Sequence, residues 1–441
     1  MTNLRQIVAD TIALCKTNGA QDAFVSFGQS HSMSVEWRKG RIENLQSAGA
    51  SSLRVRLFVD GRFSAHNTSD LRSDSISRFV ERGIAMTRLL EPDPFRGLAD
   101  PARYEGRTTQ DLELFDSAVN ALTPADLVSQ CQAIEALAQE KLDLPIEDIT
   151  SSSAAGMSRY YEMSTNGFEG ETVSTSASKS CTIVLNDDGK KPADKGFASV
   201  CHVSDFPELG AIVDEAAAFV RLRRQQKKLA SGPRTLILDR RVSQDFVESF
   251  LDPLSGYDLV ARRSYFEGKI GASLGSSLLT LVDMPHLVRG LGSAAFDGEG
   301  MATKDAMIFD KGVLQQYLLD NYCARKLDLV ATSDSLTNLV MPRGERSLQA
   351  MIADVKDGIY VISLLGGNQD DLRGDFSYGI VGVAIENGEL TTPVSEMNID
   401  GNFMNLWQRL VEVGNDPSPY SPYSNFLIPS LRIDDVSVSG T

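Results

Sequence analysis

Leu229-Ala230-Ser231-Gly232-Pro233-Arg234-Thr235-Leu236-Ile237-Leu238 marks the change in character on which the fold assignment rests. Before it lies a charged stretch that closes a predicted helix. After it comes a short apolar run, Thr235 to Leu238, which predicts a buried strand. A glycine–proline pair between two such segments is typical of a domain boundary. Because 441 residues exceed one ordinary core, we expect two domains, residues 1-230 and residues 231-441.

The first 230 residues alternate between helical and strand patterns. Apolar residues recur at helical spacing over four expected helices, residues 4–15, 73–90, 123–142 and 206–229. Strands are expected over residues 23–27, 33–37 and 52–59, and repeatedly between residues 146 and 203. Asp60-Gly61 is typical of a type I′ hairpin turn. The pattern predicts an N-terminal α/β domain with a mixed or antiparallel sheet and helices.

The second half is predicted to be mainly β. One helix is expected over residues 243–260, where Pro253 should bend or split it because proline removes a helical hydrogen bond. A shorter helix is expected between Gly401 and Leu410, and a last strand near residues 426–433. Four dipeptides are spaced as hairpin turns: Asp297-Gly298, Asp357-Gly358, Asn387-Gly388 and Asp400-Gly401. The predicted fold class is therefore α+β, with a β-rich C-terminal domain.

Composition and charge limit the classes of function. The chain has 59 acidic and 43 basic residues, a formal charge of −16, which disfavours nucleic acid as a partner. No apolar stretch is long enough to span a membrane, and the N-terminus lacks the pattern of a secretory signal. The five cysteines are scattered and include no C-x-x-C pair, as a reducing compartment permits. We expect a cytoplasmic protein.

The histidines and cysteines show no arrangement that predicts catalysis. A zinc peptidase brings imidazoles together at helical spacing, but His31, His66, His202 and His286 each lie more than five positions from another histidine. Cys201 and His202 are adjacent, and neighbours on a strand point to opposite faces. Cys323 has basic neighbours, yet its favoured interpretation is a small buried residue at a helix turn.

Asp297 and Glu299 are the carboxylates of most interest. Alternation would place both on one face, where two acids could share a proton or a cation. Gly298 and Gly300 instead favour a tight turn beside close backbone. Asp370, Asp371 and Asp375 lie in a glycine-rich segment for which a solvated loop is the default interpretation. These patterns alone define no catalytic constellation.

A series of short motifs in the C-terminal half resembles the TldD/PmbA family, known as modulators of DNA gyrase and as peptidase components. Each motif is weak alone, but their order and spacing together are specific, and two more lie in the first half. In chain order they are Gly97-Leu98-Ala99-Asp100-Pro101, Ser164-Thr165-Asn166-Gly167-Phe168, Gly290-Leu291-Gly292-Ser293, Phe296-Asp297-Gly298-Glu299-Gly300, Gly312-Val313-Leu314-Gln315-Gln316-Tyr317-Leu318, Ala324-Arg325-Lys326, Gly374-Asp375-Phe376-Ser377, Glu386-Asn387-Gly388-Glu389 and Pro429-Ser430-Leu431-Arg432-Ile433.

The family resemblance distinguishes two branches. TldD-type chains carry an H-E-x-x-x-H helix with a cysteine as a further zinc ligand, whereas PmbA (TldE) chains lack it and pair with a TldD-type chain. Here the corresponding segment, residues 250–258, contains Pro253 and no histidine, so no metal ligand can be carried over. The resemblance implies the PmbA branch, with no catalytic residue or cofactor in this chain and with zinc on the partner.

The resemblance also implies a substrate and a cleft. In such a pair the metal-bearing subunit hydrolyses unfolded or leader-type peptides, and the PmbA-type subunit helps to enclose the cavity. The substrate-cleft candidates are Phe296, Asp297, Glu299 and Gly300. Two alternatives remain open: a non-catalytic peptide-binding or regulatory homodimer, and a hydrolase with a non-zinc mechanism that uses Cys323 or the Asp297/Glu299 pair.

Overall fold

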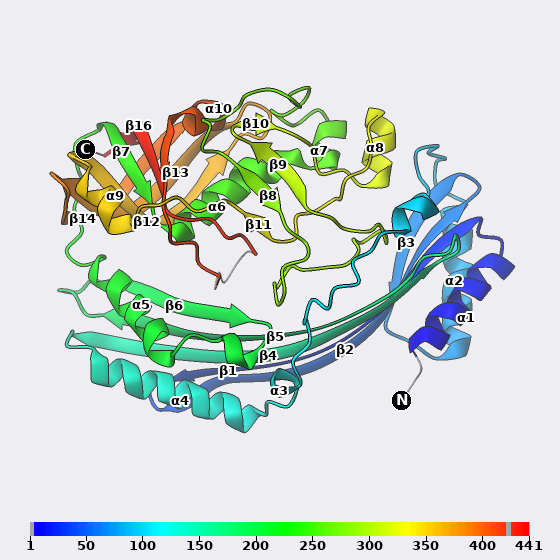
Figure 1. The fold of residues 1–441 in the computed structure, drawn as a ribbon. Coiled ribbons are helices and arrows are strands. Elements are labelled where there is room, and N and C mark those ends of the chain that lie inside the picture. The colour runs from blue at the N-terminus through cyan, green and yellow to red at the C-terminus, as the bar shows by residue number, and fades with distance from the viewer. Residues whose placement is uncertain (1–3, 420–424, 441) are drawn as a thin grey trace.

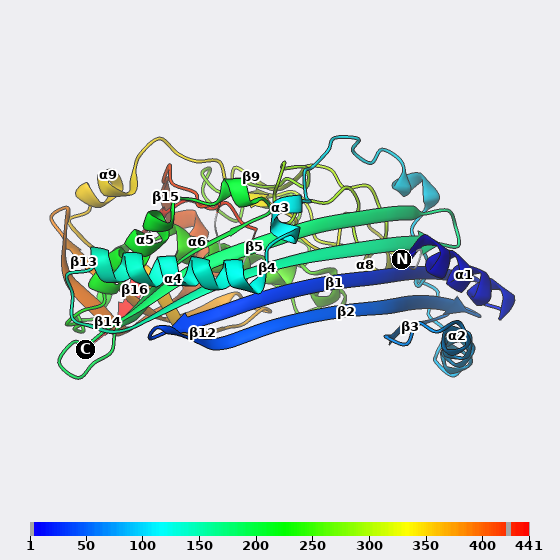
Figure 2. The ribbon, with the colours of Figure 1, turned by 90° about the horizontal axis from the view of Figure 1, so that it is seen from below.

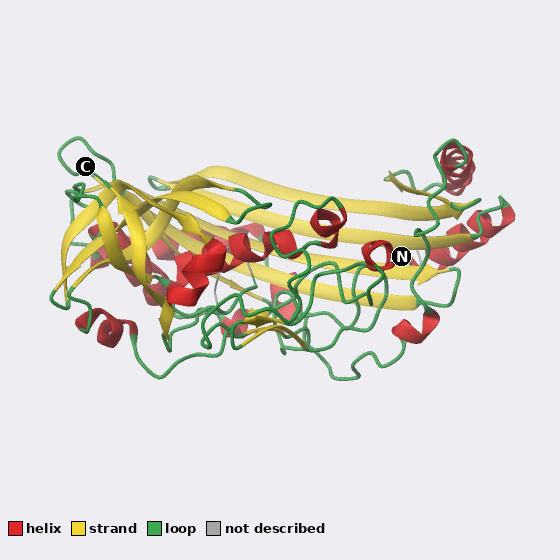
Figure 3. Ribbon diagram, turned by 90° about the horizontal axis from the view of Figure 1, so that it is seen from above, coloured by secondary structure: helices red, strands yellow, loops and turns green. Residues whose placement is uncertain are grey.

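The computed structural model describes residues 4–419 and 425–440 and contains two layers (Figure 1). A long, curved sheet built from the first 200 residues forms one layer, and the C-terminal half lies over one of its faces. Seen from above, the C-terminal strands gather over one end of this sheet, while loops cover its middle (Figure 3). The predicted α+β class, with a β-rich C-terminal half, is confirmed.

The first sheet is antiparallel throughout, with the order β3-β2-β1-β4-β5-β6. Its strands are β1 (Asp22–Arg38), β2 (Arg41–Val59), β3 (Arg62–Thr68), β4 (Ile146–Ser164), β5 (Glu169–Leu185) and β6 (Ala193–Val200). The turn at Asp60-Gly61 has φ values of 50° and 72°, as the predicted type I′ hairpin requires.

The separate strands predicted over residues 23–27 and 33–37 are wrong, because both belong to β1. The polar segment between them stays in the sheet, with Ser30 opposite Ala50 of β2 and Ser158 of β4. Since neighbours on both sides supply ladder hydrogen bonds, loss of the apolar alternation does not end the strand. At about 3.4 Å per residue, β1 extends ~55 Å.

Helices cover the outer face of the sheet at its two ends (Figure 2). Helices α1 (Leu4–Thr17) and α2 (Ser73–Thr87) pack against the hairpin end through residues such as Val8 and Val80. Helices α4 (Pro124–Lys141) and α5 (Leu209–Arg221) cover the opposite end. Between them, residues 91–123 form an extended crossing segment with only short helical turns, η1 (Pro101–Tyr104) and α3 (Ser117–Asn120).

The helix predicted over residues 206–229 is shorter at both ends than expected. Pro207 holds Phe206 in an extended conformation, so α5 starts only at Leu209. At the other end Gln225 has φ 49°, and the Lys227 amide donates to Pro393 O at 2.9 Å. Residues 222–228, which carry several basic side chains, therefore lie outside α5, and Lys227 contacts the C-terminal sheet.

The C-terminal strands close into a barrel. Their order is β14-β13-β12-β7-β16-β15, and a further pairing of β14 with β16 completes the ring. The strands are β7 (Gly232–Leu238), β12 (Asp357–Gln369), β13 (Asp375–Glu386), β14 (Glu389–Asn402), β15 (Leu410–Val413) and β16 (Leu431–Ser439). The last strand thus begins later than residue 426, because residues 425–430 lie outside this sheet.

Two of the predicted turns in this half are wrong. Asp357-Gly358 begins β12 and Asp400-Gly401 lies inside β14. A Cβ on Gly358 would lie 2.6 Å from Thr235 O of β7, so this glycine permits close strand approach. Asn387-Gly388, by contrast, forms the predicted hairpin, with φ values of 53° and 85°.

The remaining C-terminal elements surround the barrel and its core. Pro253 splits the predicted long helix into α6 (Arg240–Leu251), η3 (Asp252–Leu254) and α7 (Gly256–Val260), as expected. The predicted helix after Gly401 is limited to α10 (Phe403–Leu406) and η4 (Trp407–Arg409). The others are β8 (Leu281–Asp283), β9 (Ala306–Asp310), β10 (Val313–Leu314), β11 (Leu339–Val340), α8 (Asn321–Leu327) and α9 (Leu348–Ala353), while η2 (Val203–Asp205) belongs to the first half. Within residues 4–419 and 425–440, no helix is long and apolar enough to cross a membrane.

Gly196 sets how closely α5 lies on β6, and this gives a stability prediction. A Cβ at this position would lie 1.9 Å from Ile212 O, a backbone atom that cannot move without displacing the helix. We expect Gly196→Ala to lower the free energy of unfolding by about 2–3 kcal/mol, measured by urea denaturation. Gly49→Ala on β2 is the matched control, because its Cβ would meet nothing closer than 3.8 Å. Equal stability of both variants would contradict the prediction.

Candidate functional site

The turn that carries the sequence candidates packs against the first sheet. The Phe296 ring lies 5.1 Å from the Phe168 ring, centroid to centroid, and Phe168 stacks on Phe24 of β1 at 5.5 Å. Gly300 has φ 85°, and a Cβ there would lie 2.5 Å from the Phe168 ring. The Arg56 guanidinium donates to Gly298 O at 2.6 Å. Phe296 and Gly300 thus join the two halves of the molecule.

The two carboxylates of this turn have different partners. Asp297 accepts from the amides of Glu299 and Met301, both at 2.9 Å, and burial raises its pKa to about 7. Glu299 accepts from the backbone and side-chain amides of Asn321 at 2.8 and 2.7 Å, and burial raises its pKa as well. Asp297 lines a cavity of about 290 Å³, whereas Glu299 lines another of about 250 Å³.

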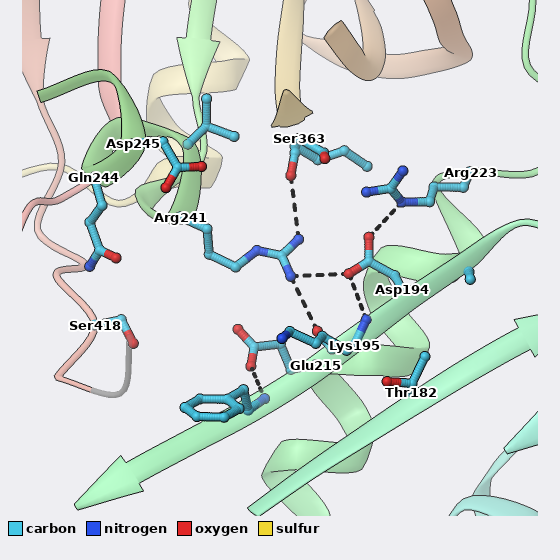
Figure 4. Close-up of a pocket in the computed structure, with 14 residues that line it drawn as sticks. Thr182, Asp194, Lys195, Glu215, Arg223, Arg241, Gln244, Asp245, Ser363 and Ser418 are labelled. Carbon is cyan, nitrogen blue, oxygen red and sulfur yellow. Dashed lines mark hydrogen bonds and ion pairs between the residues drawn. The ribbon is translucent and has the colours of Figure 1, made fainter. Parts of the chain in front are cut away.

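A larger cavity of about 350 Å³ lies where β6 and α5 meet α6 and β12 (Figure 4). Arg241 of α6 crosses this junction, pairs with Asp194 at 3.1 Å and Asp239 at 3.3 Å, and stacks on Phe219 at 3.3 Å. Arg223 pairs with the other oxygen of Asp194 at 2.6 Å. The sequence analysis did not identify these residues, because no local motif links positions so far apart.

The same junction closes the outer edge of β6. An edge strand normally leaves its backbone groups free for another strand. Here Arg241 donates to Lys195 O at 3.3 Å, and the Phe197 amide donates to Glu215 at 3.4 Å. These side chains occupy the positions that an added strand would use, so this part of the β6 edge is blocked.

Residues 250–258, which the resemblance aligns with the H-E-x-x-x-H helix, contribute to the C-terminal core. Phe250 is fully buried, and its ring contacts those of Phe266 and Trp407 at 5.3 and 5.2 Å. Leu251 and Leu254 are buried beside it. Burial, with Glu248 and Asp371 nearby, raises the pKa of Asp252 to about 6. Across residues 4–419 and 425–440, no group of three or more His, Cys, Asp or Glu side chains is placed to hold a metal ion.

The histidines and cysteines are dispersed in space as well as in sequence. His66 contacts Ser64 Oγ at 2.7 Å, His202 contacts Glu113 O at 2.7 Å, and His286 contacts Thr303 Oγ1 at 3.1 Å. Cys323 is buried in α8, and burial raises the pKa of its thiol to about 12. Asp370 forms a turn by accepting from the Leu372 amide at 2.9 Å. The predicted buried, helical setting of Cys323 is confirmed.

Solved structures match the whole fold. A crystal structure from Bacteroides thetaiotaomicron, described as a candidate modulator of DNA gyrase, has a TM-score of 0.94 and 37% sequence identity over 99% of both chains. TldE from Thermococcus kodakarensis has a TM-score of 0.86 at 19% identity, covering 98% of this chain and all of that one. At 19% identity, the likeness to TldE concerns the fold alone.

Sequence comparisons agree with this likeness. Metalloprotease PmbA of Escherichia coli O157:H7 is 27% identical over 447 aligned positions, covering 99% of this chain and 96% of the relative. A metalloprotease TldD homolog of Haemophilus influenzae matches only 40% of this chain, at 29% identity. Models of the PmbA/TldA metallopeptidase match at residues 23–87 (domain 1), 118–224 (central domain) and 231–440 (C-terminal domain). The chain therefore belongs to the PmbA/TldD metallopeptidase family.

Proposed function

We propose that this chain is a PmbA/TldE-type subunit that binds no catalytic zinc and pairs with a TldD-type chain to hydrolyse unfolded or leader-type peptides in the cytoplasm. The observation that carries the proposal is the apolar core at α6, η3 and α7. Phe250, Leu251 and Leu254 occupy the segment that would present imidazoles in a TldD-type chain. Zinc prefers imidazole and thiolate ligands in a tetrahedral set.

The residues present here do not fit such an ion. Pro253 interrupts the helical spacing that brings two ligands to one face. All five thiols are buried, and the four histidines lie on separate elements. In this proposal the metal belongs to the partner, where it polarises the scissile carbonyl. This chain supplies walls, contact area and exclusion of water.

A strand edge supports a role in holding extended peptides. Beyond Val361, β12 no longer pairs with β7, and residues 364–369 pair only with β13 within the described chain. Leu365 on this segment is exposed. Main-chain hydrogen bonding to such an edge holds a peptide with little sequence preference. Part of the β6 edge, by contrast, is blocked by Arg241 and Glu215.

The middle of the first sheet supports the same role. Its face toward the C-terminal half carries small and hydroxyl side chains, and they line a shallow hollow of about 200 Å³. Among them are Ser32, Ser34, Ala154, Gly156, Ser176 and Ser178. Such a surface offers hydrogen bonds and few apolar contacts, so it suits the wall of a chamber for unfolded chains.

Two alternatives predict different behaviour. A peptide-binding homodimer would consist of two copies of this chain and would need no TldD-type partner. A hydrolase that uses Cys323 or the Asp297/Glu299 pair is disfavoured, because the thiol is buried with a raised pKa and both carboxylates accept from backbone amides. A nucleophile or a general base must instead reach a substrate.

The first prediction concerns metal content and activity. The isolated chain should contain no stoichiometric zinc and cleave no unfolded peptide, because the side chains of residues 4–419 and 425–440 form no zinc site. Mixed with a TldD-type chain from the same organism, it should form a complex that cleaves such peptides. Metal analysis, size measurement in solution and a peptide-cleavage assay check this. Stoichiometric zinc with robust cleavage by the isolated chain would refute the proposal, and exclusive recovery of a homodimer would favour the first alternative.

The second prediction separates structural from chemical roles. Cys323→Ala and Glu299→Gln should leave peptide cleavage by the mixed complex unchanged within about twofold, a difference of ~0.4 kcal/mol in barrier. Glu299→Gln should still lower the free energy of unfolding by ~1–2 kcal/mol, because it removes a charged acceptor from the Asn321 amides. Replacing the first histidine of the partner's H-E-x-x-x-H motif by alanine is the control that should abolish cleavage. Loss of cleavage with Cys323→Ala in a stably folded complex would support the non-zinc hydrolase.

The third prediction concerns pH. The pKa of Asp297 is raised in the fold from 3.8 to about 7, so the protonated carboxyl favours folding. That stabilisation is complete below about pH 4 and is lost as the pH rises through about 7. Asp297→Asn should therefore gain ~1–3 kcal/mol relative to the wild type between pH 4 and pH 8, measured by urea unfolding. Asp310→Asn, which removes an exposed carboxylate from β9, should show no such trend. A constant difference between Asp297→Asn and wild type would contradict this assignment.

A further inference from the structure

A cavity of about 250 Å³ lies between the hairpin end of the first sheet and helices α7 and α8. Figure 1 shows these elements facing each other across the crossing segment that follows α2. Arg54 and Arg56 of β2 line one side, and Tyr257 and Asp320 line the other. Phe58 and Phe63 add an apolar wall, with ring centroids 5.1 Å apart. The cavity therefore combines cationic, acidic and aromatic groups at the junction of the two halves.

Arg56 is the unusual member of this cavity. Burial lowers the pKa of its guanidinium, and the charge lies 4.0 Å above the Phe24 ring. Its hydrogen bond to Gly298 O uses one of the five N–H donors of a guanidinium. Within the described residues Arg56 forms no ion pair. Partly desolvated charges are normally paired, so the cavity leaves an anion-binding group incompletely matched.

Arg54 extends the same cationic surface. It lies two residues from Arg56, so both side chains point to one face of β2. Among residues 4–419 and 425–440 its guanidinium forms no hydrogen bond or ion pair. Arg96, the third arginine of the cavity, is already engaged, because its guanidinium lies 3.3 Å above the Tyr322 ring. Arg54 and Arg56 therefore place two guanidinium groups without an ion pair on one face of β2.

The nearby carboxylates are for the most part already engaged with other groups. Glu299 is held by the two Asn321 amides, and Asp320 accepts from the Cys323 amide at 2.6 Å and from Tyr257 Oη at 3.1 Å. Glu162, which adjoins Arg54 across β1, accepts from Ser26 Oγ at 2.6 Å. Asp334 is exposed and accepts from Ser335 Oγ at 3.2 Å. Their charge balances the arginines at a distance, and none forms an ion pair with Arg54 or Arg56.

We propose that this cavity binds the free carboxylate at the C-terminus of a peptide, with Arg54 and Arg56 as its donors. A planar guanidinium can donate two parallel hydrogen bonds to a carboxylate. The aromatic wall accommodates the last side chain, and capture of a chain end requires no particular sequence. The inference rests on the proposed role in handling peptides, because it assigns the place where a chain end is held. The acids opposite the arginines disfavour more highly charged anions such as phosphate.

Binding to the isolated, full-length chain tests the proposal without any partner or cleavage. The probes are acetyl-trialanine as free acid, the same peptide as C-terminal amide, and inorganic phosphate, each titrated by calorimetry at low salt and pH 7. We expect the free acid to bind at least about tenfold more tightly than the amide, because only the acid forms a charge-assisted pair. Phosphate should bind more weakly than the acid.

Variants assign the binding to this cavity. Arg54→Gln should weaken binding of the free acid at least about tenfold, and Arg56→Lys should weaken it less because the charge remains. Arg41→Gln, at the far end of β2 and exposed, is the matched control and should change nothing. Equal binding of acid and amide, no binding of the acid, tighter binding of phosphate, or an unchanged affinity in Arg54→Gln would each overturn the proposal. Because no partner is used, these outcomes are independent of whether the chain pairs with a TldD-type subunit.

Discussion

The contact between Phe168 and the turn at residues 296–300 is the interaction on which the arrangement of the sites depends. Phe168 stacks on Phe24 of the first sheet and meets Phe296 of the C-terminal half. Gly300 allows this approach because no Cβ separates the turn from the ring. Two cavities are lined by residues of this turn, one including Asp297 and the other Glu299. Packing of one aromatic ring therefore positions the walls of both.

A second junction, formed by ions, holds the two halves at the other end. Arg241 connects α6 to Asp194 on β6 and at the same time caps the backbone of that strand. Since the guanidinium also stacks on Phe219, little of it remains available to a ligand. Arg56 also lies above a ring, that of Phe24, but among the described residues it forms no ion pair and donates only to Gly298 O. Arg241, which is fully paired, connects the two halves of the molecule, whereas Arg56, which has no ion pair among the described residues, is a candidate binding group.

The chain has the family's fold, and residues 250–258 contribute to its C-terminal core. The rings of Phe250 and Trp407 pack there with their centroids 5.2 Å apart. Burial of these aromatic side chains stabilises the barrel. In the proposed pairing, this packed segment leaves the zinc ligands to the partner.

Local patterns in the sequence were sufficient for the family, the α+β class, the split at Pro253 and the hairpin at Asn387-Gly388, because each depends on residues close together in the chain. They failed where neighbours decide the outcome, as in the continuous β1 and at Gly358, where a parallel strand rather than a turn requires glycine. Only the tertiary structure decided which polar groups from distant parts of the chain form hydrogen bonds and ion pairs. Arg56 and Gly298 are 242 positions apart, and Arg241 and Asp194 are 47 apart. Such pairs carry no local signal, because folding brings them together through the packing of whole sheets.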